Sequence, residues 1–308
     1  MSLSRGFLFN MILKSININS EKFPSLLKEI SLPPKQLYFF GEFPKSEVPW
    51  IAIVGTRKAS LEGINLGRRV ARFLGERGCV IVSGLALGID AAAHEGALDV
   101  GAKTVAVLGN GPDIIYPRSN TNLYNKILTN GGLILSEYDS QVEAKPYTFL
   151  ARNRIIAGLS HAIVLIEAPI KSGALHTSRL AMEFGRETYV FPGNALNPQY
   201  AGSHALIRDG ARLVHNFDDI WEDLSQNSLF KFNFENKTIT EKKININIKL
   251  ESSSELILNL IKENNNGIVI DKIVDLTGLS LNKILEIIGE LTLHGMIDEQ
   301  NGIIKILK

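Results

Sequence analysis

Cysteine is almost absent from this chain of 308 residues, which contains only Cys79. A single cysteine excludes an internal disulfide, and its place in the apolar run CVIV is typical of a small buried residue. Thiol redox chemistry and cysteine-based zinc sites are therefore not expected. No apolar run reaches the length of about 20 residues that crosses a bilayer, and the N-terminal segment lacks a small-residue cleavage site. These absences favour a cytoplasmic protein.

Several nucleotide-binding and catalytic motifs are also missing. The segment VGTRKASLEG follows the first predicted strand of the central region, where a dinucleotide-binding turn would read Gly-x-Gly-x-x-Gly. No Walker loop, nucleophile elbow or HExxH motif occurs. These absences argue against nicotinamide, nucleoside-triphosphate, serine-hydrolase and zinc-protease chemistry. We expect no metal ion and no cofactor.

Four titratable residues are candidate acids or bases. Asp90 and His94 in GIDAAAHEG are four residues apart, so they share one face of a predicted helix and are a possible acid–base couple. We favour a structural interpretation, in which Asp90 caps that helix and His94 bonds a neighbouring turn. Glu137 and Glu167 each follow a predicted strand, and we expect both to orient arginines rather than act as bases.

The formal net charge is only +1, but the charges are unevenly distributed. From Leu250 onward there are five lysines, no arginine and nine acidic residues, and every arginine precedes Leu213. A modestly basic body with an acidic C-terminal region favours a local anion site over a broad basic surface.

The middle of the chain alternates short apolar runs with segments of helical period. This alternation predicts an α/β fold with a doubly wound, mostly parallel sheet. In such sheets the ligand lies beyond the carboxyl ends of the strands. The predicted strands are Ile51–Val54, Val80–Val82, Thr104–Leu108, Leu133–Leu135, Ala162–Ile166, Thr188–Phe191 and Arg212–Val214.

Composition divides the chain into four parts. Residues 1–45 form an N-terminal lead-in that we expect to pack on the sheet, and residues 46–224 form the α/β domain. Residues 225–249, rich in Asn, Lys and Ser, predict a linker. Residues 250–308 have the outline of a winged helix-turn-helix. Its third helix carries one lysine, Lys283, and two glutamates, which is a poor match to a phosphate backbone. We therefore favour protein contact or a structural role over the binding of duplex DNA.

The segment Phe149–Thr177 is the most informative part of the sequence. It places Arg152, Asn153 and Arg154 at the start of one predicted helix, and Ser172-Gly173 at the start of the next. Guanidinium groups bind phosphate bidentately, and free N–H groups at a helix start attract anions. Glycine-rich turns after several strands, such as Gly55-Thr56-Arg57, would form an anion-binding rim on the same sheet edge. A phosphate-rich ligand is therefore predicted.

Eight motifs follow one another along the chain: IAIVGTRKAS, IVSGLALGIDAAAHEGAL, TVAVLGNGPDIIYP, GGLILSEY, FLARNRIIAGLSHAIVLIEA, SGALHTSRLAMEFGR, VFPG and LIRDGA. In this order they resemble the DNA-processing protein A family (DprA, also called Smf). The resemblance implies a Rossmann-like protein that binds single-stranded DNA, catalyses no reaction, forms a homodimer and loads the RecA recombinase onto incoming strands during natural transformation.

The same resemblance implies a set of DNA-binding residues. Within this set the cations would hold phosphates and Phe149 would stack on a base. Replacing Arg57 or Arg152 by alanine is then expected to weaken binding without unfolding the protein. The alternative is a nucleotide phosphoribohydrolase of the lysine-decarboxylase-like Rossmann group, whose PGGxGT signature is missing here. The implied set is Gly55, Thr56, Arg57, Lys58, Gly84, Phe149, Arg152, Asn153, Arg154, Lys171, Ser172 and Gly173.

Overall fold

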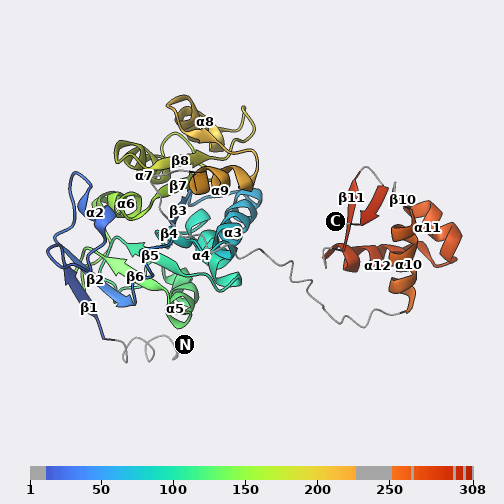
Figure 1. The fold of residues 1–308 in the computed structure, drawn as a ribbon, viewed down its shortest axis with the longest axis horizontal. Helices are drawn as coiled ribbons and strands as arrows, with labels where there is room; N and C mark the ends of the chain where they lie inside the picture. Colours follow the sequence, from blue (N-terminus) through green and yellow to red (C-terminus); the bar gives the residue numbers. More distant parts are fainter. Residues whose placement is uncertain (1–11, 227–251, 265–266, 294–295, 301–302, 307–308) are drawn as a thin grey trace. The chain divides into compact units, whose positions relative to one another are not determined.

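The chain divides into two compact units, Met1–Lys237 and Thr238–Lys308. The computed structural model describes residues 12–226, 252–264, 267–293, 296–300 and 303–306 (Figure 1). Most of the predicted linker 225–249 lies outside these residues, so the linker stays a prediction. Among the helices of the described residues, none has the length and apolar character needed to span a membrane.

The first unit is built on a sheet that has nine strands within the described residues, in the order β1-β2-β6-β5-β4-β3-β7-β8-β9. Strands β3 to β9 are mutually parallel, whereas β1 and β2 are antiparallel additions at one edge. The strands are β1 (Lys14–Asn17), β2 (Gln36–Gly41), β3 (Trp50–Val54), β4 (Val80–Ser83), β5 (Thr104–Leu108), β6 (Leu133–Ser136), β7 (Ala162–Leu165), β8 (Glu187–Val190) and β9 (Arg212–Leu213).

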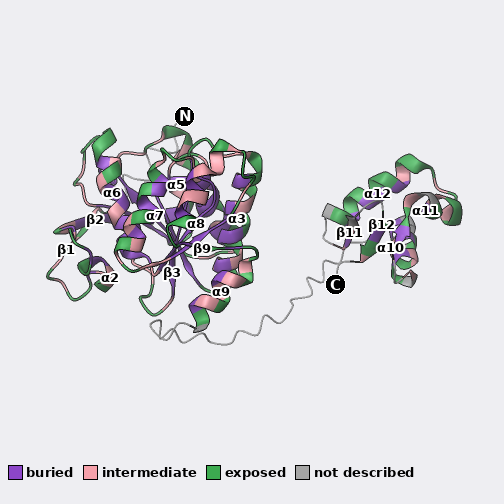
Figure 2. Cartoon of the chain, turned by 90° about the horizontal axis from the view of Figure 1, so that it is seen from above, coloured by how far each residue is buried: buried purple, intermediate pink, exposed green. Residues whose placement is uncertain are grey.

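Helices cover both faces of this sheet, so the predicted doubly wound architecture is confirmed. In β7, Ile163 and Leu165 join one apolar core, whereas Ala162 and Val164 join the other, because successive side chains of a strand point to opposite faces. The strands are therefore buried between outer helices (Figure 2). One face packs against α2 (Ser25–Lys28), α6 (Pro146–Leu159), α7 (Gly173–Glu183) and α8 (Ala201–Arg208), and the other against α3 (Leu61–Glu76), α4 (Ile89–Asp99), α5 (Thr121–Thr129) and α9 (Phe217–Gln226).

The N-terminal segment extends the sheet instead of merely packing on it. Strand β2 pairs with β6 in antiparallel register, with Tyr38 opposite Ser136. Leu37 and Phe39 are buried in the core that α6 covers. Apolar residues at alternate positions form one buried face of a strand, so this pattern explains why the segment joins the sheet as β2.

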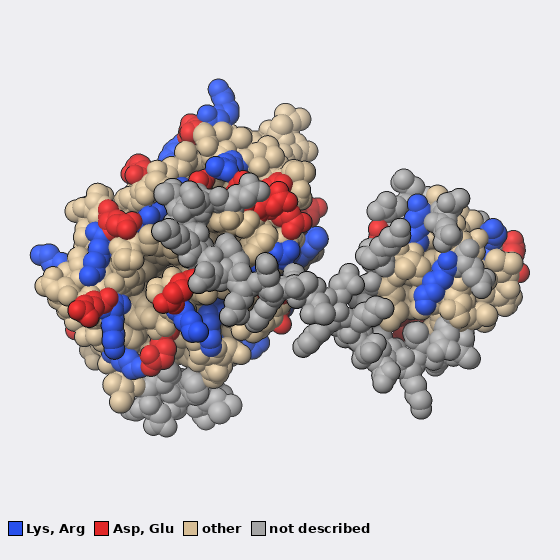
Figure 3. All heavy atoms as spheres, viewed as in Figure 1, with Lys and Arg blue, Asp and Glu red and all other residues tan. Residues whose placement is uncertain are grey.

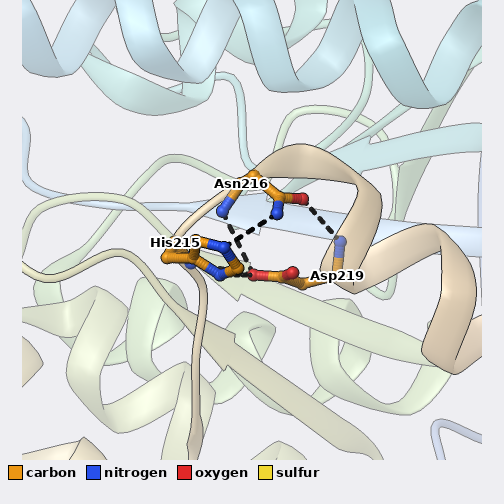
Figure 4. A network of polar contacts seen from close by, with 3 residues as sticks. All are labelled: His215, Asn216 and Asp219. Atoms are coloured by element: carbon orange, nitrogen blue, oxygen red, sulfur yellow. Dashed lines mark hydrogen bonds and ion pairs between the residues drawn. The ribbon is translucent and has the colours of Figure 1, made fainter.

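Helix α9 begins with a compact polar network (Figure 4). The Asn216 side-chain oxygen accepts a hydrogen bond from the Asp219 backbone N–H at 3.0 Å, and the Asp219 carboxylate accepts one from the Asn216 backbone N–H at 3.1 Å. The backbone N–H groups of Asn216 and His215 lower the pKa of Asp219 because they stabilise its charged form. This reciprocal capping arrangement fixes where the last described helix of the first unit starts.

The second unit has its own apolar core, which consists largely of isoleucine. A turn at Gly278, with φ of +64°, separates α11 from α12. The element order is the one that a winged helix-turn-helix requires, and assignment to that class stays a prediction. The elements are α10 (Ser252–Glu263), β10 (Ile268–Val269), α11 (Ile270–Thr277), α12 (Leu281–Leu293), β11 (Ile297–Gln300) and β12 (Ile303–Ile306), with the strand order β10-β12-β11.

Candidate functional site

The candidate site lies at the carboxyl ends of the parallel strands in the first unit. Strand β3 has β4 on one side and β7 on the other, so the strand order reverses at β3. Ligands of doubly wound sheets bind where the order reverses. Arg57 follows β3, Gly84 follows β4, and the first turn of α6 reaches the same edge through Phe149.

Arg57, Phe149 and Arg152 come together at this edge, although they belong to two distant segments. The guanidinium carbon of Arg57 lies 5.1 Å from the centre of the Phe149 ring, and that of Arg152 lies 5.9 Å from it. Both distances are within the range of cation–π contacts. Gly109 makes room for the ring, since a Cβ there would lie 2.8 Å from a Phe149 ring carbon. Arg57 is exposed, whereas Phe149 is partly buried.

Arg152 is a buried clamp on the sheet rather than an open phosphate ligand. It is only 4% exposed, and one of its Nη atoms donates to the backbone oxygens of Gly84, at 2.8 Å, and Val107. Gly84 leaves space for this guanidinium, because a Cβ there would lie 2.3 Å from it. Burial lowers the pKa of Arg152 to about 10, so the group is still a cation at neutral pH. Helix α6 begins at Pro146, which places Arg152 in its second turn and not at its start.

Asp90 and His94 also have structural contacts. The prediction that Asp90 caps its helix is wrong, because α4 has no side-chain cap and Asp90 lies in its first turn. The Asp90 carboxylate instead accepts a hydrogen bond from the Gly84 N–H at 3.2 Å. Burial raises the pKa of Asp90, and the charge of Arg152 opposes this shift. His94 contacts the hydroxyl of Thr104 through Nδ1 at 2.7 Å, on a strand rather than on the predicted turn. Asp90 therefore stabilises the turn that Arg152 also holds.

The other predicted residues of the Phe149–Thr177 segment connect α6 to its neighbours. Arg154 forms a 2.6 Å ion pair with Glu137, as expected for a glutamate that orients an arginine. The Asn153 amide donates to the backbone oxygen of Gly173 at 3.3 Å. Ser172 caps α7 by accepting from the Leu175 N–H, which confirms the predicted helix start there.

The prediction that Glu167 orients an arginine is wrong. Its buried carboxylate instead accepts hydrogen bonds from the backbone N–H and the hydroxyl of Ser60, the N-cap of α3, with 2.8 Å to the hydroxyl. The end of β7 lies beside the start of α3, where unpaired N–H groups and the helix dipole favour a negative charge. Gly63 allows this approach, because a Cβ there would lie 2.2 Å from the carboxylate.

Some of the predicted residues remain open to a ligand. Arg57, Lys58 and Lys171 are exposed and form no ion pair with any described residue. On the face shown in Figure 3, basic and acidic residues of the first unit are interspersed, which fits a local anion site. Gly55 and Thr56 are less accessible, since Ile89 lies against Gly55 and the Thr56 N–H donates to the Glu167 backbone oxygen.

Tyr116 is an additional aromatic residue at this site. Its ring centre lies 5.4 Å from that of Phe149, and the side chain is 45% exposed. Tyr116 stands in the motif TVAVLGNGPDIIYP, but the sequence gives no local sign of a contact with a residue 33 positions away. We use the word lip for the group Arg57, Lys58, Tyr116, Phe149 and Lys171.

A doubly wound sheet of this kind, with exposed cations and aromatic rings in a lip at its carboxyl edge, defines a Rossmann-like protein. The family model described as DNA recombination-mediator protein A matches residues 14–225. The chain belongs to this family, which confirms the family resemblance of the motifs.

Individual relatives are similar over the first unit. The chain is 41% identical over 209 residues to Protein Smf of Escherichia coli, a match that covers 68% of this chain and 56% of that protein. It is 42% identical over 206 residues to the DNA processing protein DprA of Streptococcus pneumoniae, covering 67% of this chain and 72% of the relative. The matched part thus spans little more than half of the E. coli protein.

Two solved structures support the fold. The X-ray structure of DprA from S. pneumoniae has a TM-score of 0.65 and 39% identity, covering 68% of this chain and 74% of its own. The DprA structure from Helicobacter pylori has a TM-score of 0.63 and 31% identity, covering 70% of this chain and 97% of its own. The H. pylori protein is described as having a unique single-stranded DNA binding mode. The predicted Rossmann-like fold of the first unit is confirmed.

Proposed function

We propose that this protein binds single-stranded DNA at the lip and acts as a recombination mediator. In this proposal it forms a homodimer, protects the incoming strand and loads RecA onto it during natural transformation, without catalysing a reaction itself. Family membership and the described DNA binding of the H. pylori relative support the proposal. The observation that carries it is the contact of the exposed Arg57, which forms no ion pair with any described residue, with the ring of Phe149 at the carboxyl edge of the sheet.

The chemistry of the lip suits an unpaired strand of mixed sequence. Cations bind the phosphates of any nucleic acid, and aromatic rings stack on exposed bases regardless of sequence. Duplex DNA offers the phosphates but keeps its bases stacked inside. Binding should therefore be stronger for a single strand than for a duplex of the same length, and fluorescence anisotropy at two salt concentrations measures both. Equal affinity for the two forms would contradict the proposed mode.

Replacing Arg57 by alanine is expected to weaken single-strand binding about tenfold, since one phosphate contact and one cation–π contact are lost. The slope of log affinity against log salt should fall in magnitude by about 0.7, the value for one phosphate of a single strand. Arg72→Ala is the matched control because Arg72 is an exposed arginine of α3. If both variants bind like the wild type, the lip is not the binding site.

The hydrolase alternative has little support at this edge. The carboxylates of Asp90 and Glu167 are both buried and accept hydrogen bonds from the protein itself. A base that cleaves a ribosyl bond has to reach the substrate or its attacking water. Incubation with nucleoside monophosphates is expected to release no free base, measured by chromatography. Steady release that exceeds the protein concentration would favour the enzyme instead.

A further inference from the structure

Phe149 does not offer an open ring face in this structure, although it is the aromatic residue that the motif suggests for base stacking. The guanidinium groups of Arg57 and Arg152 lie over the ring, and the backbone at Gly109 approaches it closely. The ring of Tyr116 also packs against it, with 5.4 Å between the ring centres. Phe149 is accordingly only partly exposed. A base has little room to stack directly on it.

Tyr116 has the open ring that Phe149 lacks. Its side chain is 45% exposed, and its ring is tilted by 38° against Phe149 at a centroid distance of 5.4 Å. Phe149 thus contacts both Arg57 and Tyr116. Arg57 and Tyr116 are the more exposed residues of this group, and both pack against the less exposed Phe149.

The loop that carries Tyr116 is held in place by hydrogen bonds. The Asn110 amide donates to the Ile114 backbone oxygen at 2.6 Å, and the Asn120 amide donates to the Leu85 backbone oxygen at 2.9 Å. The buried Tyr124 hydroxyl donates to the Pro112 backbone oxygen at 2.6 Å. A ring on a loop fixed in this way loses little conformational entropy on binding.

We infer that Tyr116 is the base-stacking residue of the lip, and that Phe149 positions it together with Arg57. The inference rests on the proposed single-strand binding and assigns its aromatic contact to a particular ring. The ligand contacted is the face of an unpaired base, while Arg57 contacts the phosphate or the face of a neighbouring base. A neutral ring displaces no counterions, so its contribution should not depend on salt.

Tyr116→Leu tests this assignment by removing the ring. Affinity for a mixed-sequence oligonucleotide should fall about tenfold, the order expected for one stacked base, with an unchanged salt slope. Tyr116→Phe, which keeps the ring, should bind like the wild type. For an oligonucleotide made of abasic sites, wild type and Tyr116→Leu should bind equally. Wild-type affinity of Tyr116→Leu for the mixed-sequence oligonucleotide would overturn the inference.

Tyr147→Leu is the matched control. Tyr147 is 63% exposed and lies in the first turn of the same α6 that carries Phe149. If exposure alone selected the stacking residue, this variant would lose as much affinity as Tyr116→Leu. We expect it to lose less than about twofold, and an equal loss would overturn the role of Phe149 as support.

Cross-linking of the wild-type protein tests the inference without relying on variants that have to fold. Ultraviolet cross-linking to an oligonucleotide that contains 5-iodouracil, followed by mass spectrometry, should modify Tyr116. Cross-links confined to other residues would overturn the inference. Absence of any single-strand binding by the wild type would instead contradict the proposed function, so the two failures are distinguishable.

Discussion

Arg152→Met is expected to lower the free energy of unfolding of the first unit by about 3 to 5 kcal/mol, the usual cost of leaving a buried charge without its partner. Burial raises the pKa of Asp90, and its carboxyl group loses the positive charge that opposes this shift. The backbone oxygens of Gly84 and Val107 lose their shared donor as well. Each buried acceptor without a partner accounts for about 1 to 3 kcal/mol of this loss. Urea denaturation followed by circular dichroism measures the change.

Arg154→Met is the appropriate control, since it removes an arginine two residues away in the same helix. Arg154 pairs with Glu137 at a partly exposed position, so its removal should cost less than removal of the buried Arg152. The double variant Arg152→Met with Asp90→Asn should be destabilised by less than the sum of the two single changes, because both charges are gone. Equal stability of the Arg152→Met and Arg154→Met variants would rule out the clamp.

This result changes how binding data on the arginine cluster are interpreted. From the sequence alone, Arg57 and Arg152 are equivalent phosphate ligands whose replacement leaves the fold intact. In the structure only Arg57 is exposed. If an Arg152 variant loses DNA binding, the first explanation is therefore damage to the lip, because Arg152 contacts Gly84 and Phe149. A lost phosphate contact is the second explanation.

The sequence did contain a signal for the burial of Arg152. Ile155, Ile156 and Leu159 follow it at spacings of three, four and seven residues, which is the apolar stripe of a buried helix face. Arg152 belongs to that stripe and Arg154 does not. The Arg-Asn-Arg cluster suggests that both arginines bind phosphate. The helical period instead predicts that Arg152 is buried and that Arg154 is not.

The layered sheet was predictable because each parallel strand is a short apolar run between turn residues, as in IAIV and AIVLI. The partner of Glu167 was not, since it depends on β7 ending beside the start of α3, a juxtaposition that spacing along the chain does not reveal. The contact of Tyr116 with Phe149 is equally non-local. Sequence patterns thus located the edge of the sheet at which the site lies, while the packing of distant segments decided which side chains remain open there.

His94 supplies the second large expected effect, a loss of stability in mild acid. Its ring is fully buried, and Nδ1 donates to the Thr104 hydroxyl, whose own proton goes to the Ile81 backbone oxygen at 2.8 Å. Nε2 is therefore the unprotonated nitrogen, and it has no hydrogen-bond partner. Burial, reinforced by the charge of Arg152, lowers the pKa of His94 to about 3. The folded protein consequently excludes the protonated imidazole, whereas the unfolded chain accepts it near pH 6.5.

The stability that depends on neutral His94 is present above pH 6.5 and is lost as the pH falls from there toward about 3, by about 1.4 kcal/mol per pH unit. His94→Asn keeps an amide donor for Thr104 but does not titrate, so its free energy of unfolding should vary less steeply with pH. Asp90 has a raised pKa, so its contribution to the free energy of unfolding increases as the pH falls. This contribution is present in both proteins and cancels when their slopes are compared. Denaturation curves at several pH values between about 4 and 8 give the two slopes. Parallel curves for wild type and His94→Asn would show that His94 takes up its proton without unfolding.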